Sequence, residues 1–350
     1  MPPTPAYQPP LRRMLLRAAL VAGWQASPLA FAGPEAASAP ASEEQSELRA
    51  WLMRIHAAAS RQSFEGTFVV SAAGVVSSAR IAHFCVGANQ FERIEPLDGQ
   101  ARRVFRHNDK VFTFWPAARS VLIEQRNLIA SFPALLQAGA SRVDGYYVMR
   151  KGGTERMAGR EAELLLIESR DKLRFGYRLW ADKATALLLR VEVIGDKAQV
   201  IESSAFSDLT IGVKPHPERV LQAMQQIDGY RVVKPAMSPT RLDAEGWSMR
   251  LSVPGFEQLS CIKRPLDGLP ADDRDAQTEV LQTIFADGLT HVSLFIEPYH
   301  PERHRREMQT SIGATHTLMR RHGDWWVTTV GDVPAVTLRQ FDGALEFNKK

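Results

Sequence analysis

Cysteine is scarce in this sequence, whose 350 residues contain only Cys85 and Cys261. A small exported scaffold held together by disulfide bonds needs several cysteine pairs, so the sequence excludes that class of protein. The two cysteines lie far apart and are expected in different domains. Because free cysteine is among the most buried residue types, we interpret them as two separate buried thiols, and a bond between them is left open.

Long apolar runs are also missing. No stretch after residue 32 approaches the roughly 20 apolar residues of a membrane-spanning helix. A shorter run, residues 14–24, follows paired arginines and ends at "SPLAFAG", where Ala30 and Ala32 supply small side chains. This order predicts a signal peptide over residues 1–32, cleaved near Ala32, and hence an exported protein. The paired arginines leave the twin-arginine route open as the less favoured alternative to general secretion.

The sequence has no strong excess of either charge once this segment is set aside. Residues 1–32 hold three arginines and no acid, so the formal net charge of +4 falls to +1 for the rest. Overall charge therefore gives no support for nucleic-acid binding, and a charged partner has to be met by local patches. The remaining chain is long enough for two domains that bury cores without disulfides.

Motifs of the common enzyme classes are absent as well. The sequence has no G-x-S-x-G elbow, no P-loop and no G-x-G-x-x-G. His83 and Cys85 face the same side of an expected strand, but no third group that would orient the histidine is evident. A thiol in apolar surroundings is normally inert. We therefore predict that the protein is not an enzyme and has no cofactor.

The stretch "YHPERHRREM", residues 299–308, places two histidines four residues apart with a glutamate between them. A zinc-protease helix needs H-E-x-x-H, whereas Glu302 lies one residue too late between His300 and His304, about 100° further around a helix. The neighbouring arginines would also repel a divalent cation. Further ligands would have no defined spacing, the candidates being His291, His316 and His322. We expect no metal site here.

The same stretch is rich in arginine. Arginine suits the recognition of carboxylates and phosphates, and arginine with tryptophan is typical of binding hot spots. The alternative is that these arginines only solvate a loop and that one tryptophan of the pair Trp325–Trp326 is core, since consecutive strand residues face opposite sides. The candidate residues for a partner-binding surface are Arg303, Arg305, Arg306, Arg320, Arg321 and Trp325.

The mature chain begins with a leader and a helix. Residues 33–42 are rich in alanine, proline and serine and are expected to be disordered. Ser42 and Gln45 have the spacing of a capping box, and an apolar stripe at helical period follows. The stripe consists of Leu48, Trp51, Leu52, Ile55 and Ala59. One face of this predicted helix must therefore pack against apolar residues.

Short strands with tight turns then continue to residue 212, which predicts an antiparallel meander curled into a barrel or half-barrel. Several strands are apolar on both faces, so either helices cover the second face or the inside is a cavity. Prolines break the pattern, and we place a linker at residues 213–225 between domains of residues 43–212 and 226–350. The second is predicted to be a smaller α+β domain with a helix from about Pro334 to Phe347.

Residues 157–212, "MAGREAELLLIESRDKLRFGYRLWADKATALLLRVEVIGDKAQVIESSAFSDLTIG", resemble the RseB/MucB family of exported negative regulators of the envelope-stress sigma factor sigma-E (AlgU-type). The segments "FEGTFVV", "FADGLTHVSLFIEP" and "IGATHTLMRRHGDWWVTTVGDVPAVTL" are also similar to that family. The resemblance covers nearly all of the mature chain. It departs at "KATALLL", where a "TGLPL"-like turn is expected, which puts the geometry of that turn in doubt.

The resemblance implies an α+β fold: an N-terminal domain like the lipoprotein carriers LolA and LolB, an incomplete antiparallel β-barrel with covering helices, and a smaller C-terminal α+β domain. It implies a periplasmic protein that binds the periplasmic domain of a membrane-bound, RseA/MucA-like anti-sigma factor and shields it from first-site proteolysis. Bound lipopolysaccharide or lipoprotein acyl chains would release it. A periplasmic lipid or lipoprotein carrier is the alternative, and homo-oligomer formation is left open.

A lipid pocket is then expected inside the first domain. Burial of acyl chains stabilises a complex by about 0.8 kcal/mol per methylene. One chain alone gives only marginal membrane affinity, about 10⁴ M⁻¹, so a lipid with several chains is the favoured effector. Ordinary core packing is the alternative role for each candidate lining residue. The candidates are Phe68, Val70, Phe84, Phe112, Phe114, Leu128, Phe132, Tyr177 and Trp180.

Overall fold

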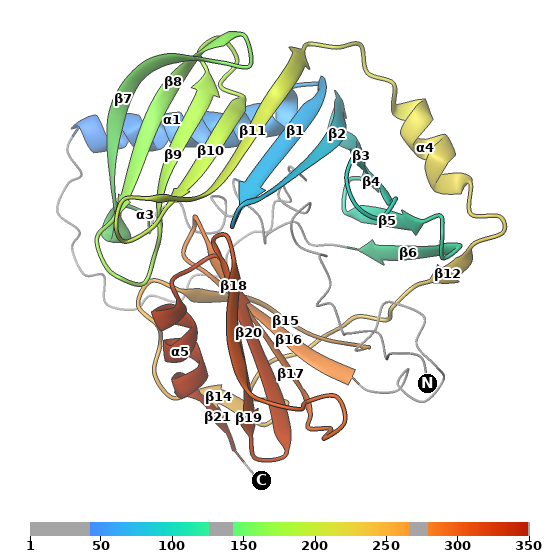
Figure 1. The fold of residues 1–350 in the computed structure, drawn as a ribbon, viewed down its shortest axis with the longest axis vertical. Helices are drawn as coiled ribbons and strands as arrows, with labels where there is room; N and C mark the ends of the chain where they lie inside the picture. Colours follow the sequence, from blue (N-terminus) through green and yellow to red (C-terminus); the bar gives the residue numbers. More distant parts are fainter. Residues whose placement is uncertain (1–42, 126–142, 266–278, 349–350) are drawn as a thin grey trace.

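The computed structural model describes residues 43–125, 143–265 and 279–348. A large sheet with helices packed against it is followed by a smaller unit of strands and one helix (Figure 1). The expected fold class, α+β with an incomplete antiparallel barrel and a smaller second domain, is confirmed. Within the described residues, none of the helices combines the length and the apolar character of a membrane span.

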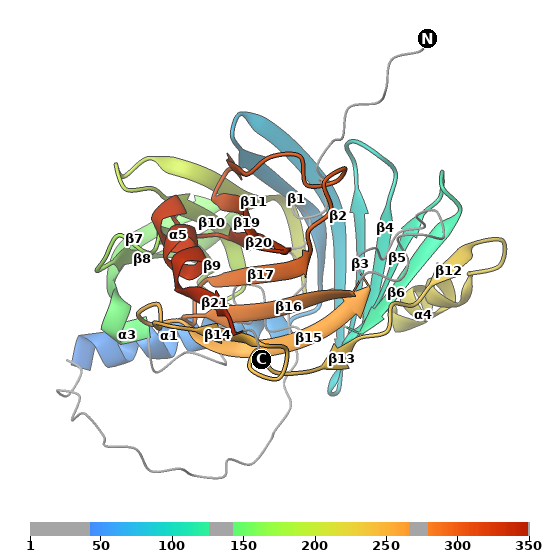
Figure 2. The ribbon, with the colours of Figure 1, turned by 90° about the horizontal axis from the view of Figure 1, so that it is seen from below.

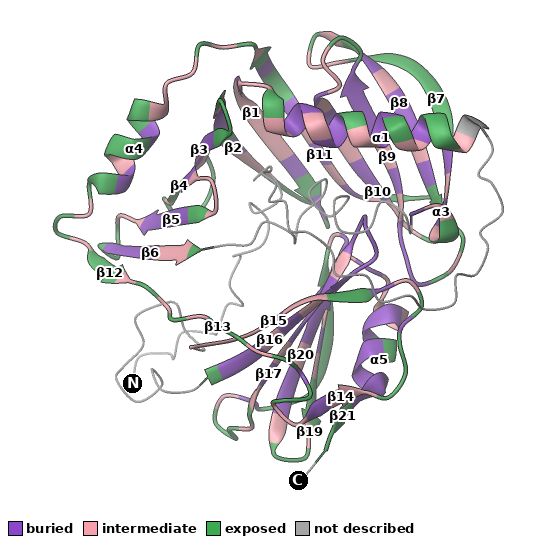
Figure 3. Cartoon of the chain, turned by 180° about the vertical axis from the view of Figure 1, so that it is seen from behind, coloured by how far each residue is buried: buried purple, intermediate pink, exposed green. Residues whose placement is uncertain are grey.

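Helix α1 (Glu43–Arg61) confirms the predicted apolar stripe. Leu48, Trp51, Leu52 and Ile55 are buried along one face of the helix. They pack against the buried side chains of β7 to β10, and Figure 3 shows α1 lying across these strands. The helix therefore covers one apolar face of the sheet. Strands that are apolar on both faces need such a cover, because the second face would otherwise be exposed to water.

The first sheet has the spatial order β12-β6-β5-β4-β3-β2-β1-β11-β10-β9-β8-β7. Its neighbouring strands are antiparallel, except that β12 runs parallel to β6. The sheet stays open because β7 and β12 end it on either side. Its strands are β1 (Phe64–Ala72), β2 (Val75–Val86), β3 (Asn89–Pro96), β4 (Arg103–His107), β5 (Lys110–Trp115), β6 (Ser120–Gln125), β7 (Tyr147–Met157), β8 (Arg160–Ser169), β9 (Gly176–Asp182), β10 (Leu188–Ile194), β11 (Val200–Ile211) and β12 (Arg231–Val233).

The hairpins of the first sheet are determined by the residues in their turns, whereas at the centre of the sheet strands far apart in the sequence pair with each other. Ala158 and Gly159 connect β7 to β8 with φ of 47° and 77°, as a two-residue type I′ turn requires. The short helix α3 (Val143–Tyr146) precedes β7. In the middle, Phe64 of β1 lies opposite His83 of β2 on one side and Ile211 of β11 on the other.

The segment expected to be a linker contains helix α4 (Pro217–Gln225), which packs on β3 and β4. Proline at the first helical position is favourable, because that position has no hydrogen bond to lose. Val220 and Met224 are buried on the sheet. The chain then adds β12 to the sheet edge before it enters the second unit, so residues 213–233 belong structurally to the first domain.

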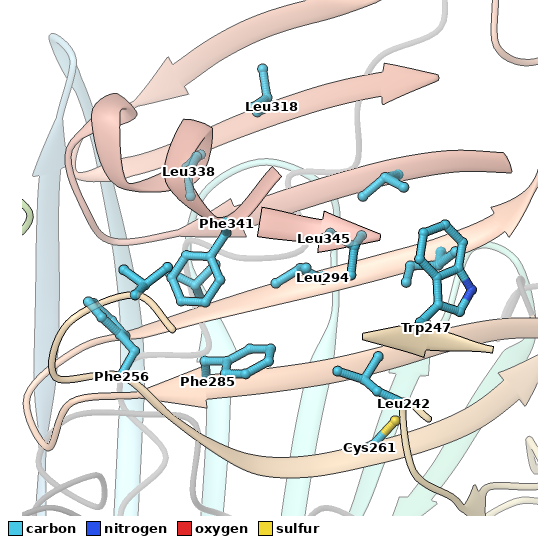
Figure 4. Close-up of a cluster of buried hydrophobic side chains, with 14 of the residues drawn as sticks. Leu242, Trp247, Phe256, Cys261, Phe285, Leu294, Leu318, Leu338, Phe341 and Leu345 are labelled. Atoms are coloured by element: carbon cyan, nitrogen blue, oxygen red, sulfur yellow. The ribbon is translucent and has the colours of Figure 1, made fainter. Parts of the chain in front are cut away.

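The second sheet has the order β13-β15-β16-β17-β20-β19-β18. Helix α5 (Ala335–Ala344) lies close to where the C-terminal helix was expected and packs on β19 and β20 (Figure 2). Its residues Leu338 and Phe341 meet Phe256, Phe285 and Leu294 in the core of the second domain (Figure 4). The strands are β13 (Ser238–Pro239), β15 (Glu257–Pro265), β16 (Glu279–Ala286), β17 (His291–Pro298), β18 (Met308–Ile312), β19 (Thr315–His322) and β20 (Trp325–Gly331), with a separate pair β14 (Trp247–Met249) and β21 (Leu345–Phe347).

A buried ion pair joins the two domains. Arg174, before β9, donates through Nε to Asp287 Oδ2 after β16 at 2.7 Å, and both side chains are 0% exposed. The hydroxyl of Tyr147 donates to the same oxygen at 2.8 Å. The other carboxylate oxygen of Asp287 accepts from the backbone N–H groups of Leu289 and Thr290, each at 2.9 Å. Every oxygen of the buried carboxylate is thus satisfied.

The β18–β19 hairpin makes a second contact between the domains. The backbone N–H of Ala314 donates to Glu202 Oε2 of β11 at 3.2 Å. Its neighbour Gly313 has a φ of 57°, and a Cβ added there would lie 2.7 Å from the Cβ of Ala72. Glycine is therefore required both by the backbone conformation and by the close approach to the first sheet.

Candidate functional site

The predicted lipid-lining residues that the structure describes divide among separate buried clusters. Phe84, Phe112 and Phe114 form one cluster with Val220 and Met224 of α4. These three phenylalanines are therefore core side chains between the sheet and that helix.

The remaining candidates lie elsewhere. Tyr177 belongs to the cluster beneath α1, whereas Trp180 and the partly buried Phe68 belong to a third cluster around Phe64 and Phe206. Val70 is buried in β1. The last two candidates lie outside the described residues; they are Leu128 and Phe132.

Strand alternation explains the separation. His83 precedes Phe84 in β2 and so faces the other side of the sheet, where its ring stacks on Phe64 at 5.1 Å between centroids. On that same side, Cys85 Sγ donates to the carbonyl of Ser60 in the last turn of α1 at 3.0 Å. The end of α1 and the whole of α4 therefore lie on opposite faces of β2 to β4.

A pocket of about 370 Å³ opens beside the C-terminal half of α1. Its wall carries charges of both signs: Asp182 binds Arg160 at 2.7 Å, and Lys183 binds Glu161 at 3.3 Å. None of the predicted lipid-lining residues in the described part of the chain lines this pocket. It is lined by Trp51, Arg54, Ala57, Ala58, Arg61, Gln62, Glu163, Asp182, Lys183, Ala184, Thr185 and Ala186.

The turn in which the sequence departs from its family pattern forms part of this wall. Ala186 has a φ of 60°, a left-handed conformation that glycine adopts without strain and alanine does not. Asp182 holds the turn, because its Oδ2 accepts from the backbone N–H of Thr185 at 2.9 Å and from the Thr185 hydroxyl at 2.7 Å. The turn is therefore kept by hydrogen bonds where the expected glycine and proline are absent.

A charged network is buried where β2, β3 and β4 meet. Arg106 donates to both oxygens of Glu92, at 2.5 and 2.7 Å, and His83 Nδ1 lies 2.8 Å from Glu92 Oε1. Burial opposes ionisation, but the positive charge of Arg106 and the hydrogen bond with His83 hold the pKa of Glu92 below its usual value. The carboxylate is therefore ionised and fully paired inside the sheet.

Cys85 completes a cysteine–histidine–glutamate line, with Sγ 3.2 Å from His83 Nε2. Burial first, and then the negative charge of Glu92, raise the pKa of the Cys85 thiol to about 11. A catalytic cysteine needs the opposite shift, since the thiolate is the nucleophile. The geometry of a triad is thus present, but the thiol stays protonated.

Residues 299–308 form a structured loop after β17. The ring of His304 is buried and stacks on Trp326 at 4.7 Å between centroids, and its Nδ1 accepts from the backbone N–H of His300 at 2.9 Å. Burial, with the positive charge of Arg303, lowers the pKa of His304 to about 4. His304 is therefore a neutral packing residue. The described part of the chain contains no group of three or more acidic, histidine or cysteine side chains placed to hold a metal.

The predicted partner-binding residues divide between two faces. Arg303 lies 3.4 Å from Glu297, and Arg321 covers the ring of Tyr299 at 3.9 Å. Arg320 instead reaches Asp342 of α5 at 3.4 Å. The residues near the loop are Arg303, Arg305, Arg306 and Arg321, of which the last three are exposed.

Trp325 packs on the far side from these loop arginines, beside Trp247 and Phe347. Four of the six candidates thus share one region, and Arg320 and Trp325 belong to another. Trp326, the other member of the tryptophan pair, lies under the loop.

The residues that make the buried contacts were not predicted from the sequence. Glu92 lies opposite both His83 and Arg106 in the strand register, so a correct pairing of the three strands would have placed them together. No local signal connects Arg174 with Asp287, because 113 residues separate them.

Two family models match the chain. The model of the MucB/RseB N-terminal domain matches residues 47–224, and that of the MucB/RseB C-terminal domain matches residues 241–346. The sigma factor AlgU regulatory protein MucB of Pseudomonas aeruginosa is 28% identical over 294 residues, covering 82% of this chain and 87% of the relative. The sigma-E factor regulatory protein RseB of Escherichia coli K12 is 22% identical over 303 residues, covering 85% and 90%.

Solved structures agree with these relatives. MucB in complex with the periplasmic part of MucA is 25% identical, with a TM-score of 0.62, covering 87% of this chain and 100% of that one. The Pseudomonas aeruginosa MucA/MucB complex gives a TM-score of 0.65 at 24% identity with the same coverage. The relatives' names describe regulatory proteins, which agrees with the expectation that the chain is not an enzyme.

Proposed function

The chain belongs to the MucB/RseB family, and on that premise we propose that it binds the periplasmic domain of a membrane-bound anti-sigma factor and shields that domain from first-site proteolysis. One observation carries the proposal: both domains of the family match, in order, over nearly the whole described chain. The structures of MucB bound to MucA support a partner of this kind for a related protein. The signal peptide expected at residues 1–32 would place the protein in the periplasm.

We further propose that acyl chains of lipopolysaccharide or lipoprotein release the partner. The core beneath α1 supports this step, because it includes Tyr177 of the first domain together with Leu289 and Ala314 of the second. An apolar guest that entered beneath α1 would touch both domains. Such a guest would change the affinity for the anti-sigma domain by a coupling free energy, typically about 1 to 3 kcal/mol, and the effect would be reciprocal.

The test measures binding of the mature chain to the periplasmic domain of the MucA homologue from the same organism, with and without lipid A. Binding without lipid, and at least about fivefold weaker binding at saturating lipid A, are expected from a coupling of about 1 kcal/mol. Lipid A with its acyl chains removed is the control and should leave the affinity unchanged. Undetectable binding of the anti-sigma domain would refute the regulatory function, and lipid binding without it would favour a carrier.

Two variants locate the lipid step. Tyr177→Ala removes a side chain beneath α1, whereas Phe112→Ala removes one beneath α4 on the opposite face. Each variant loses a buried aromatic ring, so both are expected to lower stability by about 3 to 5 kcal/mol. Only Tyr177→Ala is expected to change the effect of lipid A on partner binding. An equal change in both variants would place the lipid elsewhere.

Shielding from proteolysis is tested separately. The anti-sigma domain is incubated with the first-site protease in the presence of the mature chain, and its cleavage rate is measured before and after lipid A is added. Slower cleavage that recovers with lipid A is expected. Cleavage at an unchanged rate, in a mixture where binding is demonstrated, would remove shielding from the proposed function.

A further inference from the structure

Among the described strands, β18 is a sheet edge that lacks the usual blocking features. Its sequence, "MQTSI", has neither charge nor proline, all of its residues are exposed, and its pairing with β19 has no bulge. Natural sheets normally block such an edge with charge, proline, a bulge or very short length, since open backbone groups attract another strand.

The other edges of the two sheets are blocked in these ways. Strand β7 carries Arg150, Lys151 and Arg156 and has a register shift between Lys151 and Gly153. Strand β12 has only 3 residues. Strand β13 has 2 residues, one of them Pro239. The difference points to a use for the β18 edge.

The hairpin geometry determines which backbone groups of β18 face outward. A two-residue turn, Gly313–Ala314, connects it to β19, and Ile312 is paired with Thr315. In such a turn the flanking residues are hydrogen-bonded to each other, and hydrogen-bonded pairs alternate with non-bonded ones along the ladder. Gln309 and Ser311 therefore direct both N–H and C=O away from β19, toward an added strand.

The two ends of this edge differ in chemistry. Arg305 and Arg306 lie just before β18, separated from it by Glu307, and both are exposed. Arg306 makes no ion pair with any described residue. Glu302 and Glu307 are the nearby acids, and Glu307 is engaged by the backbone N–H of Arg321 at 3.0 Å. The two arginines and two glutamates balance formally, so this end offers an incoming strand two exposed guanidinium groups rather than a net charge.

The other end of the edge is apolar. Ile312 is 46% exposed, and it adjoins Gly313, which approaches Ala72 of the first domain. Beside Ala72 in the β1–β2 hairpin, Val75 and Val76 are 53% and 63% exposed. An added strand would thus run from arginines at one end to exposed aliphatic side chains of both domains at the other.

We propose that the β18 edge binds an extended segment of the anti-sigma partner as an additional strand, with acidic residues facing Arg305 and Arg306 and an apolar residue near Ile312 and Val76. This proposal rests on the proposed function, because the segment is assigned to that partner. Main-chain hydrogen bonds would supply affinity, and the two ends would fix the direction of the strand.

The decisive variant is Ser311→Pro. It removes an outward N–H and fills the space of the added strand, while the hydrogen bonds between β18 and β19 are kept. Ser311→Ala, which keeps the N–H and removes the hydroxyl, is the matched control. Binding of the MucA-homologue domain is expected to weaken at least tenfold in Ser311→Pro and by less than twofold in Ser311→Ala. Arg305→Glu combined with Arg306→Glu should also weaken it at least tenfold.

Hydrogen exchange on the unmodified protein gives an independent measurement. The amides of Gln309 and Ser311 should exchange fast in the free chain and slowly in the complex. Protection elsewhere but not at these two amides would overturn the proposal, as would tight binding by a folded Ser311→Pro variant. If Ser311→Pro instead abolishes self-association of the chain, the edge pairs with a second copy, which also overturns it. Failure of the unmodified protein to bind would refute the proposed function itself.

Discussion

The buried pair between Arg174 and Asp287 gives the sharpest test of how the domains are joined. Substitution Asp287→Ala leaves the Arg174 guanidinium buried at the interface without its carboxylate. It also removes the acceptor of the Tyr147 hydroxyl and of two backbone N–H groups. Removal of one partner of a buried pair destabilises proteins by about 3 to 5 kcal/mol, largely because the remaining charge is unpaired.

The other contacts of Arg174 place the expected loss of stability at the lower end of that range. Its guanidinium also binds Asp171 at 2.5 Å and the carbonyl of Pro254 at 2.5 Å, and it lies 4.2 Å from the ring centre of Tyr146. These contacts keep part of the charge satisfied, so we expect a loss of about 3 kcal/mol for Asp287→Ala. For Asp287→Asn we expect about half of that, since the amide oxygen can still accept hydrogen bonds.

The assay is equilibrium unfolding of the mature chain in urea, followed by a probe in each domain. The control is Asp171→Asn, whose carboxylate is partly exposed and should lose no more than about 1 kcal/mol. The combined variant Arg174→Met with Asp287→Leu should recover only part of the loss. It removes the unpaired arginine charge, but the Tyr147 hydroxyl and the two backbone N–H groups still lack their acceptor. A loss below about 1 kcal/mol for Asp287→Ala would refute the conclusion that this pair is a buried contact between the domains.

The side chains of Cys85, His304 and Ala186 allow three further measurements. Because burial raises the pKa of Cys85 to about 11, its thiol should react with a disulfide reagent at pH 8 about 100-fold more slowly than an unperturbed thiol. Unfolding in urea should abolish this difference in rate. An equally fast reaction of the folded chain would contradict the prediction. The pKa of His304 is lowered to about 4, so the unfolded state takes up the proton first as the pH falls. The free energy of unfolding should keep its full value above about pH 6.5 and fall by at most about 3 kcal/mol as the pH drops toward 4. In urea titrations, His304→Phe should remove this part of the pH dependence. Ala186→Gly should raise the free energy of unfolding by about 0.5 to 1 kcal/mol by relieving a left-handed φ, whereas Ala184→Gly should not, and a loss of stability in Ala186→Gly would show that the turn is unstrained.

Much of the local structure could be predicted from the sequence. The stripe from Leu48 to Ala59 identified α1, because apolar residues at helical period have one simple explanation. The C-terminal helix was expected from about Pro334 to Phe347 and runs from Ala335 to Ala344. The prolines at 215 and 217 were interpreted as a break between domains, whereas Pro217 begins α4. Proline is compatible with a linker and with the first turn of a helix, and the burial of Val220 and Met224, which marks the helix, was not considered.

The candidate site was harder to predict for a physical reason. Alternation along a strand shows which side chains share a face, but it does not show which face is enclosed. Phe84, Phe112 and Phe114 were correctly placed on apolar strands, yet α4 covers their face. Likewise, His83 and Cys85 were known to be neighbours, but Glu92 joins them only through the pairing of β2 with β3.

Strand β1 has a consequence for how the nascent chain acquires its structure. One of its edges can pair with β2 as soon as residue 86 is made, but the other waits for β11, because Phe64 lies opposite Ile211. Pairings between distant segments form slowly, and the waiting edge is open to intermolecular aggregation in the meantime. A chain truncated before residue 200 should therefore aggregate, whereas one that ends after β12 carries every strand of the first sheet and leaves neither edge of β1 unpaired.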